Sequence, residues 1–126
     1  MLWGRSSAKV VLVVEDDPSI GELIAAVLML AGFEPVIVRD GEHALRTVRE
    51  VAPDVITLDL DMPGIDGRAV LRSLRSDAEW RNVPVVVVSA NSDRLSTGES
   101  GQVVQTLPKP FEVGELVQAV SSAVQN

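Results

Sequence analysis

Acidic side chains follow two separate apolar runs of this sequence, at the points where those runs end. Glu15 and Asp16 come directly after the first run, and Asp59, with Asp61 two positions later, comes directly after the third. Carboxylate oxygens are ligands that Mg²⁺ prefers, and an aspartate can act as the nucleophile in phosphoryl transfer. If the fold brings these acids together, they predict a divalent metal beside a nucleophilic carboxylate.

A hydroxyl and an amine follow two further apolar runs. Ser89 follows the run of residues 85–88, and Lys109 follows the weaker run of residues 103–107. Two carboxylates 4 Å apart repel each other by about 1 kcal/mol in water and by about 4 kcal/mol at an effective dielectric near 20. A purely structural cluster would therefore not gather three acids without cations. Lys109 supplies one positive charge, and Mg²⁺ is the natural second.

The elements that must position these residues alternate between short apolar runs and helical periods. The five predicted strands are residues 10–14, 35–38, 55–58, 85–88 and 103–107. The β-branched residues of the first run follow one another without polar alternation, which is typical of a strand buried on both faces. Alternating strands and helices predict an α/β fold, a parallel sheet with right-handed crossovers and helices on both faces. Ligands of such sheets bind outside the carboxyl ends of the strands, where all the residues named above lie.

Helix signals fill the gaps between the strands. Asp17 is followed by Pro18, a capping residue with a proline at the first helical position, and Gly32 ends the same helix. Asp40 and Asp66 are predicted to cap two more helices.

The last two gaps differ from each other. Residues 112–124 carry one apolar face and predict a regular final helix. Residues 92–101 contain two glycines and three serines, with Leu95 the single large apolar residue. Any fourth helix there is expected to be short or frayed.

Composition narrows the functional classes. The 126 residues suit one domain, which we place at residues 9–126 after an N-terminal extension of residues 1–8. The chain has no cysteine and one histidine, so a zinc site built on those ligands is not expected. A net charge of −7 does not favour direct binding to nucleic acid. No apolar run approaches the roughly 18–20 residues that a membrane span needs, so we expect a cytoplasmic protein that does not bind membranes.

Five segments carry a resemblance to a known family, in the family's order. They are VLVVEDDPS at residues 11–19, DGEHAL at 40–45, DLDMPGIDG at 59–67, PVVVVSA at 84–90 and LPKPF at 107–111. The chain resembles a response-regulator receiver domain of bacterial two-component signalling, of the single-domain chemotaxis type. The resemblance implies a doubly wound, flavodoxin-like fold with five parallel strands in the order 2-1-3-4-5. It also implies that no output domain follows in this chain.

The resemblance assigns roles to the acids. Asp59 matches the phosphoacceptor, and Asp16 matches the acid that binds Mg²⁺ directly. Glu15 matches the acid that reaches the metal through water, while Asp61 matches the position whose backbone carbonyl completes the metal site. These four residues are therefore the expected metal site.

The resemblance also identifies the residues expected to bind the phosphoryl group. Ser89 matches the hydroxyl that bonds a phosphoryl oxygen, and Lys109 matches the lysine that pairs with it. Pro110 resembles the family's cis-proline. Thr106 stands where many receivers have an aromatic switch residue, so we expect the loop after Ser89 and residues 92–101 to carry the conformational change instead.

A switch of this kind implies protein partners rather than a substrate. The phosphoryl donor is expected to be a histidine kinase or a phosphotransfer protein, and the chain would catalyse only its own phosphorylation and dephosphorylation. The output partner is expected on the face of the fourth helix, fifth strand and fifth helix. Two alternatives stay open: a haloacid-dehalogenase-like phosphatase using Asp59 and Asp61, and a pseudo-receiver that binds partners without being phosphorylated.

Overall fold

Five parallel strands form a single sheet in the order β2-β1-β3-β4-β5, which confirms the predicted topology. A computed structural model of the protein describes residues 8–62, 67–90 and 103–125. The strands are β1 (Val10–Val14), β2 (Glu34–Val38), β3 (Val55–Asp59), β4 (Val85–Ser89) and β5 (Val103–Pro108). The helices of the described residues are α1 (Pro18–Leu30), α2 (Gly41–Val51), α3 (Gly67–Ser76) and α4 (Val113–Gln125).

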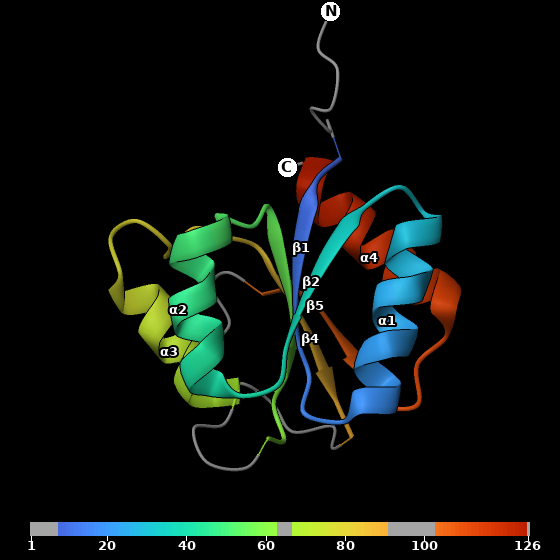
Figure 1. The fold of residues 1–126 in the computed structure, drawn as a ribbon, viewed down its shortest axis with the longest axis horizontal. Helices are drawn as coiled ribbons and strands as arrows, with labels where there is room; N and C mark the ends of the chain where they lie inside the picture. Colours follow the sequence, from blue (N-terminus) through green and yellow to red (C-terminus); the bar gives the residue numbers. More distant parts are fainter. Residues whose placement is uncertain (1–7, 63–66, 91–102, 126) are drawn as a thin grey trace, which may run out of the picture.

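The sheet separates two hydrophobic cores, and a pair of helices covers each of its faces (Figure 1). Helices α2 and α3 cover one face, while α1 and α4 cover the other. Alternate residues of β1 point to opposite sides, so Leu12 and Val14 join the first core and Val11 and Val13 join the second. Every residue of β3 and β4 is buried, as the unbroken apolar runs predict for central strands.

The predicted caps begin two of the helices. The Asp17 carboxylate accepts hydrogen bonds from the Ser19 and Ile20 amides, at 2.9 and 3.2 Å, with Pro18 in the first turn of α1. The Asp40 carboxylate accepts a hydrogen bond from the His43 amide at 2.8 Å at the start of α2. Each cap fixes the course of the chain directly after β1 or β2, where the polar edge of the sheet lies.

Two predicted features fall outside the described residues. Asp66, the expected cap of α3, is one of them, and the expected fourth helix at residues 92–101 is the other. Helix α4 of the structure is therefore the predicted final helix. None of the helices in the described ranges has both the length and the apolar character that crossing a membrane requires.

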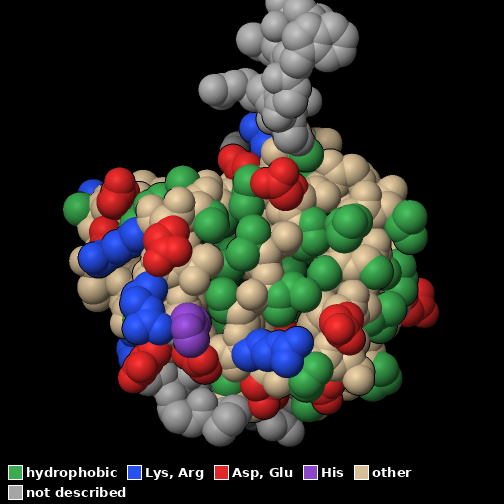
Figure 2. Space-filling model, viewed as in Figure 1, with side chains coloured by type: hydrophobic (Ala, Val, Ile, Leu, Met, Phe, Trp, Pro, Cys, Tyr) green, Lys and Arg blue, Asp and Glu red, His purple; other side chains and the backbone are tan. Residues whose placement is uncertain are grey.

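The surface seen in Figure 2 has a charged region and a hydrophobic region. Charged side chains gather over α2, and hydrophobic side chains gather over α1. Three large apolar side chains of α1 are exposed: Leu23, Met29 and Leu30.

Candidate functional site

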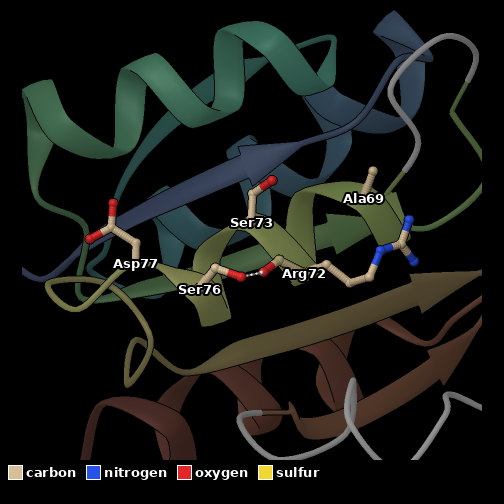
Figure 3. A pocket seen from close by; sticks show the side chains of 5 residues that line it. All are labelled: Ala69, Arg72, Ser73, Ser76 and Asp77. Carbon is tan, nitrogen blue, oxygen red and sulfur yellow. Dashed lines mark hydrogen bonds between the residues drawn. The ribbon is translucent and has the colours of Figure 1, made fainter.

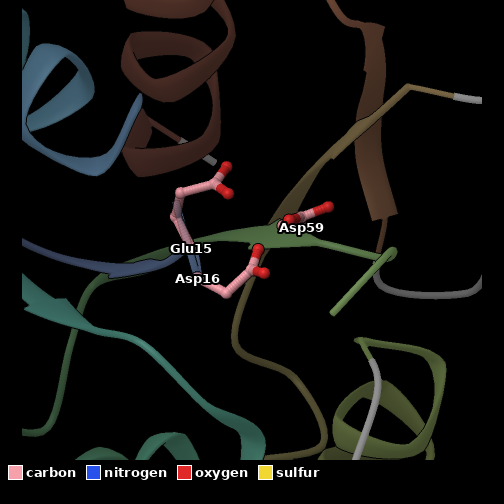
Figure 4. A group of neighbouring side chains, drawn as sticks. All are labelled: Glu15, Asp16 and Asp59. Carbon is pink, nitrogen blue, oxygen red and sulfur yellow. The ribbon is translucent and has the colours of Figure 1, made fainter. Parts of the chain in front are cut away.

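Three acids meet at the carboxyl ends of β1 and β3. Glu15, Asp16 and Asp59 each offer a carboxylate oxygen, and these oxygens all lie within 4.8 Å of one another (Figure 4). The two strands pair in parallel, so the residues that follow them emerge side by side. Glu15 is 1% exposed and Asp59 is 2% exposed, whereas Asp16 is half-buried. The structure therefore confirms the prediction from the sequence that these three acids lie close together.

Lys109 brings a positive charge into this group from the end of β5. Its Nζ lies 2.8 Å from Glu15 Oε1 and 3.3 Å from Asp59 Oδ2, and its side chain is 15% exposed. The Lys109 amide donates to the Ser89 carbonyl at 2.8 Å, which holds the end of β5 beside the end of β4. The peptide bond between Lys109 and Pro110 is cis.

Burial dominates the electrostatics of Glu15. Loss of solvent raises the pKa of its carboxyl from 4.5 to about 7, against the lowering effect of the Lys109 ammonium and with a further rise from Asp59. Burial alone would lower the pKa of Lys109, but its hydrogen bond with Glu15 and the negative charges of Asp59 and Glu15 outweigh that effect and raise it. Lys109 therefore stays charged, while Glu15 is poised to bind either a proton or a cation.

The donor set fits a hard divalent cation. Two ionised carboxylates within 4.8 Å of each other repel by at least about 3 kcal/mol at an effective dielectric of 20. One ammonium group does not neutralise three such charges. Mg²⁺ and similar cations take oxygen ligands from one or two carboxylates, carbonyls and water. The residues that could hold such an ion are Glu15, Asp16 and Asp59.

Asp61 contacts other residues of the site through its side chain as well as its backbone. Its amide donates to Asp59 Oδ1 at 2.9 Å, which fixes one oxygen of the Asp59 carboxylate. Its own Oδ2 accepts hydrogen bonds from Ser89 Oγ at 3.0 Å and from the Ala90 amide at 3.1 Å. The resemblance to receiver domains assigned a role only to the backbone carbonyl of Asp61, because nothing in the residue pattern fixes the direction of an exposed carboxylate.

Gly67 is a site residue that the sequence analysis did not single out. It begins α3, and a Cβ at this position would lie 2.2 Å from the Asp59 carbonyl oxygen and 2.6 Å from the Leu60 Cα. Only glycine allows the helix to approach the backbone that carries Asp59 so closely. The signal was present in the segment DLDMPGIDG, but a close approach between distant backbones is not readable from spacing alone.

Thr106 is the position where an aromatic switch residue was expected from the family pattern. It is an exposed residue of β5 that pairs with Val87 of β4, in register two positions before the pair of Ser89 and Pro108. The structure thus brings together the predicted acids, Ser89 and Lys109. The expected switch segment at residues 92–101 falls in the part of the chain that is not described.

A hollow lies along α3 and carries no comparable chemistry (Figure 3). Among its lining residues, the Ser76 hydroxyl donates to the Arg72 carbonyl at 3.0 Å, a bond within the helix. Asp77 pairs with Arg49 of α2 at 3.0 Å. These contacts are structural, so the acidic site is the candidate for function.

Comparison with known proteins agrees with the geometry. The family model of the response regulator receiver domain matches residues 11–121. The DNA-binding response regulator MtrA of Mycolicibacterium smegmatis is 38% identical over 117 residues, which cover 91% of this chain and 50% of MtrA. The chain thus spans about half the length of this curated relative.

Solved structures share the whole fold. A sensor protein from Polaromonas sp. JS666 superposes with a TM-score of 0.87 at 32% identity, over 94% of this chain and 97% of that one. The receiver domain of the sensor histidine kinase PA1611 from Pseudomonas aeruginosa gives 0.85 at 29% identity, over 95% and 100%. These matches go against the phosphatase alternative. The chain belongs to the family of response regulator receiver domains, the phosphorylation-activated switches of two-component systems.

Proposed function

We propose that Asp59 is the residue of this receiver domain that accepts the phosphoryl group. The observation that carries the proposal is the setting of its carboxylate. It is 2% exposed, one oxygen is fixed by the Asp61 amide at 2.9 Å, and the other faces Lys109 Nζ at 3.3 Å. Glu15 is also held by an amide and by Lys109, but we assign it to the metal ion rather than to the phosphoryl group, because its carboxylate belongs to the acidic group that could bind a cation.

The chemistry is a phosphoryl transfer between two nucleophiles. A carboxylate oxygen of Asp59 bonds to the phosphorus of a phosphohistidine, the phosphorus–nitrogen bond breaks, and its electron pair stays on the imidazole. Lys109 lies where its charge stabilises the transferring oxygens, so the chain contributes mainly positioning and electrostatics. Hydrolysis reverses the state: water attacks phosphorus, inorganic phosphate leaves, and the Asp59 carboxylate is restored.

The cofactor we propose is Mg²⁺. Glu15, Asp16 and Asp59 would hold it, with the backbone carbonyl of Asp61 as the remaining protein ligand. Support comes from the acidic group itself and from the PA1611 receiver domain, whose structure is described with a magnesium ion coordinated in the active site cleft. When bound, the ion would supply positive charge to the phosphoryl oxygens.

The partners follow from this chemistry. We propose a histidine kinase or a phosphotransfer protein as donor, and a downstream protein that reads the face of β5 and α4. The part of that face expected from residues 92–101 lies outside the described residues. The matched region, residues 11–121, supports a receiver domain at residues 9–126.

Acetyl phosphate with Mg²⁺ tests the proposal without knowledge of the kinase. Intact-mass measurement should detect one phosphoryl group on the wild-type chain and none on Asp59→Asn. The matched control is Asp17→Asn, which changes a nearby exposed acid but keeps the helix cap. A wild-type chain that gains no phosphoryl group under these conditions would favour the pseudo-receiver alternative.

A further inference from the structure

The carboxylate of Asp61 occupies two hydrogen-bond donors at the end of β4. A single oxygen, Asp61 Oδ2, accepts from Ser89 Oγ at 3.0 Å and from the Ala90 amide at 3.1 Å. Ser89 is 1% exposed, whereas Asp61 is an exposed residue. An exposed carboxylate thus turns back toward the sheet and bonds to a buried hydroxyl.

Those donors are next to the proposed phosphorylation site. Asp59 is in register with Val88 across the paired strands β3 and β4, so Ser89 and Ala90 directly follow its neighbour. The Asp61 amide also donates to Asp59 Oδ1 at 2.9 Å, which links the two acids. A phosphoryl group on Asp59 would therefore place its oxygens near the same hydroxyl and amide.

Two kinds of acceptor would then compete for one pair of donors. A phosphoryl group brings three strong acceptor oxygens and a charge of about −1.5 to −2. A serine hydroxyl and a backbone amide each have one hydrogen to donate. They cannot serve the Asp61 carboxylate and a phosphoryl oxygen fully at the same time. Repulsion between the two anions also favours the departure of Asp61.

We propose that Asp61 is an internal competitor of the phosphoryl group. Its carboxylate holds Ser89 and Ala90 in the unphosphorylated chain, and the phosphoryl group must displace it to bond them. The inference rests on the proposed phosphorylation of Asp59 and adds to it a residue that sets how readily the modified state forms. Asp61 is a positioning residue in this account, because it acts through Ser89 and Ala90.

Beryllofluoride, a noncovalent stand-in for the phosphoryl group, tests the competition directly. Its affinity is measured at saturating Mg²⁺ from the amide shifts of a labelled full chain. Asp61→Ala removes the competing acceptor and should bind about tenfold more tightly than wild type, the size expected for one hydrogen bond to a charged group. Asp61→Asn keeps a neutral acceptor and should fall between the two. Asp17→Asn removes a nearby charge without touching Ser89 and should stay within about twofold of wild type.

A second readout separates competition from a general effect of charge. In the Ser89→Ala background, Asp61→Ala should gain clearly less than tenfold, because the shared hydroxyl is gone. In the ligand-free chain, the Ala90 amide resonance should move in Asp61→Ala, since its acceptor is lost. Equal affinities for wild type and Asp61→Ala, or equal gains in Asp61→Ala and Asp17→Asn, would overturn the competition while leaving the proposed function intact. Failure of every variant to bind beryllofluoride would overturn both.

Discussion

Substituting Gly67 by alanine should damage both the stability and the phosphorylation of this domain. The added Cβ would lie 2.2 Å from the Asp59 carbonyl oxygen, 2.6 Å from the Leu60 Cα and 2.9 Å from the Asp59 carbonyl carbon. All three atoms belong to backbone, so no side chain can rotate out of the way. Helix α3 and the end of β3 must therefore separate by about 1 Å to reach ordinary contact distance.

The expected free-energy change has two opposing parts. Alanine in place of glycine normally stabilises a helix by up to about 1 kcal/mol. Forcing extra volume into a packed site typically costs about 1–3 kcal/mol, and a backbone clash lies at the upper end. We expect a net loss of about 2 kcal/mol, which lowers Tm by about 5–10 °C for a domain of this size. A displacement of Asp59 by about 1 Å can slow its phosphorylation by about 100-fold.

Gly114 supplies the matched control, because it lies in the first turn of α4, where an added Cβ would meet no atom of another element within 4 Å. Gly114→Ala should leave Tm unchanged or raise it slightly. Thermal melts followed by circular dichroism compare the two variants, and acetyl phosphate labelling gives the rate. A Gly67→Ala chain that melts at or above the wild-type temperature would refute the close-approach argument.

Three further predictions concern the acids and the lysine. Mg²⁺ should raise Tm, because it binds only the native site. Asp16→Ala should abolish this rise. Asp17→Ala should keep the rise and lower the free energy of unfolding only by the contribution of a helix cap, about 0.5–2 kcal/mol. Without divalent metal, stability should fall as pH rises from 4.5 to about 7, because folded Glu15 retains a proton that the unfolded chain has lost. This loss of unfolding free energy is about 3 kcal/mol at most. Denaturant titrations of Glu15→Gln over the same pH range should not show the loss. If the unfolding free energy of that variant fell with pH as steeply as that of wild type, Glu15 would not be its source. Lys109→Ala should still fold but should be less stable than wild type in metal-free buffer, and Mg²⁺ should restore part of the lost stability. Complete unfolding of this variant in both buffers would show that Lys109 is mainly structural.

Much of the fold could be predicted from the sequence, because the patterns that mark its strands and helix starts are local. Unbroken apolar runs such as residues 85–88 identify strands that lie inside a sheet, and Asp17 with Pro18 marks a helix start without reference to distant residues. Parallel topology then brings the strand ends to one edge. The meeting of Glu15 and Asp59 follows from that rule, so the acidic group was predictable from the sequence.

The remaining features depend on contacts between distant backbones or on side-chain orientation. The need for glycine at position 67 arises where α3 meets the end of β3, and no local pattern encodes that distance. The turn of the Asp61 carboxylate toward Ser89 is one choice among several rotamers open to an exposed residue. The raised pKa of Glu15 depends on how completely the surrounding residues exclude water, which the sequence does not specify.

The most direct test of the central claim is to trap the acyl phosphate chemically. Borohydride reduces a phosphorylated aspartate to homoserine, and peptide mass spectrometry then locates the reduced residue. After treatment with acetyl phosphate and Mg²⁺, we predict homoserine at position 59, and none when either reagent is omitted. Homoserine at Asp16 or Asp61 instead, or no reduced residue in a chain that has gained a phosphoryl group, would contradict the assignment of Asp59 as the phosphoacceptor.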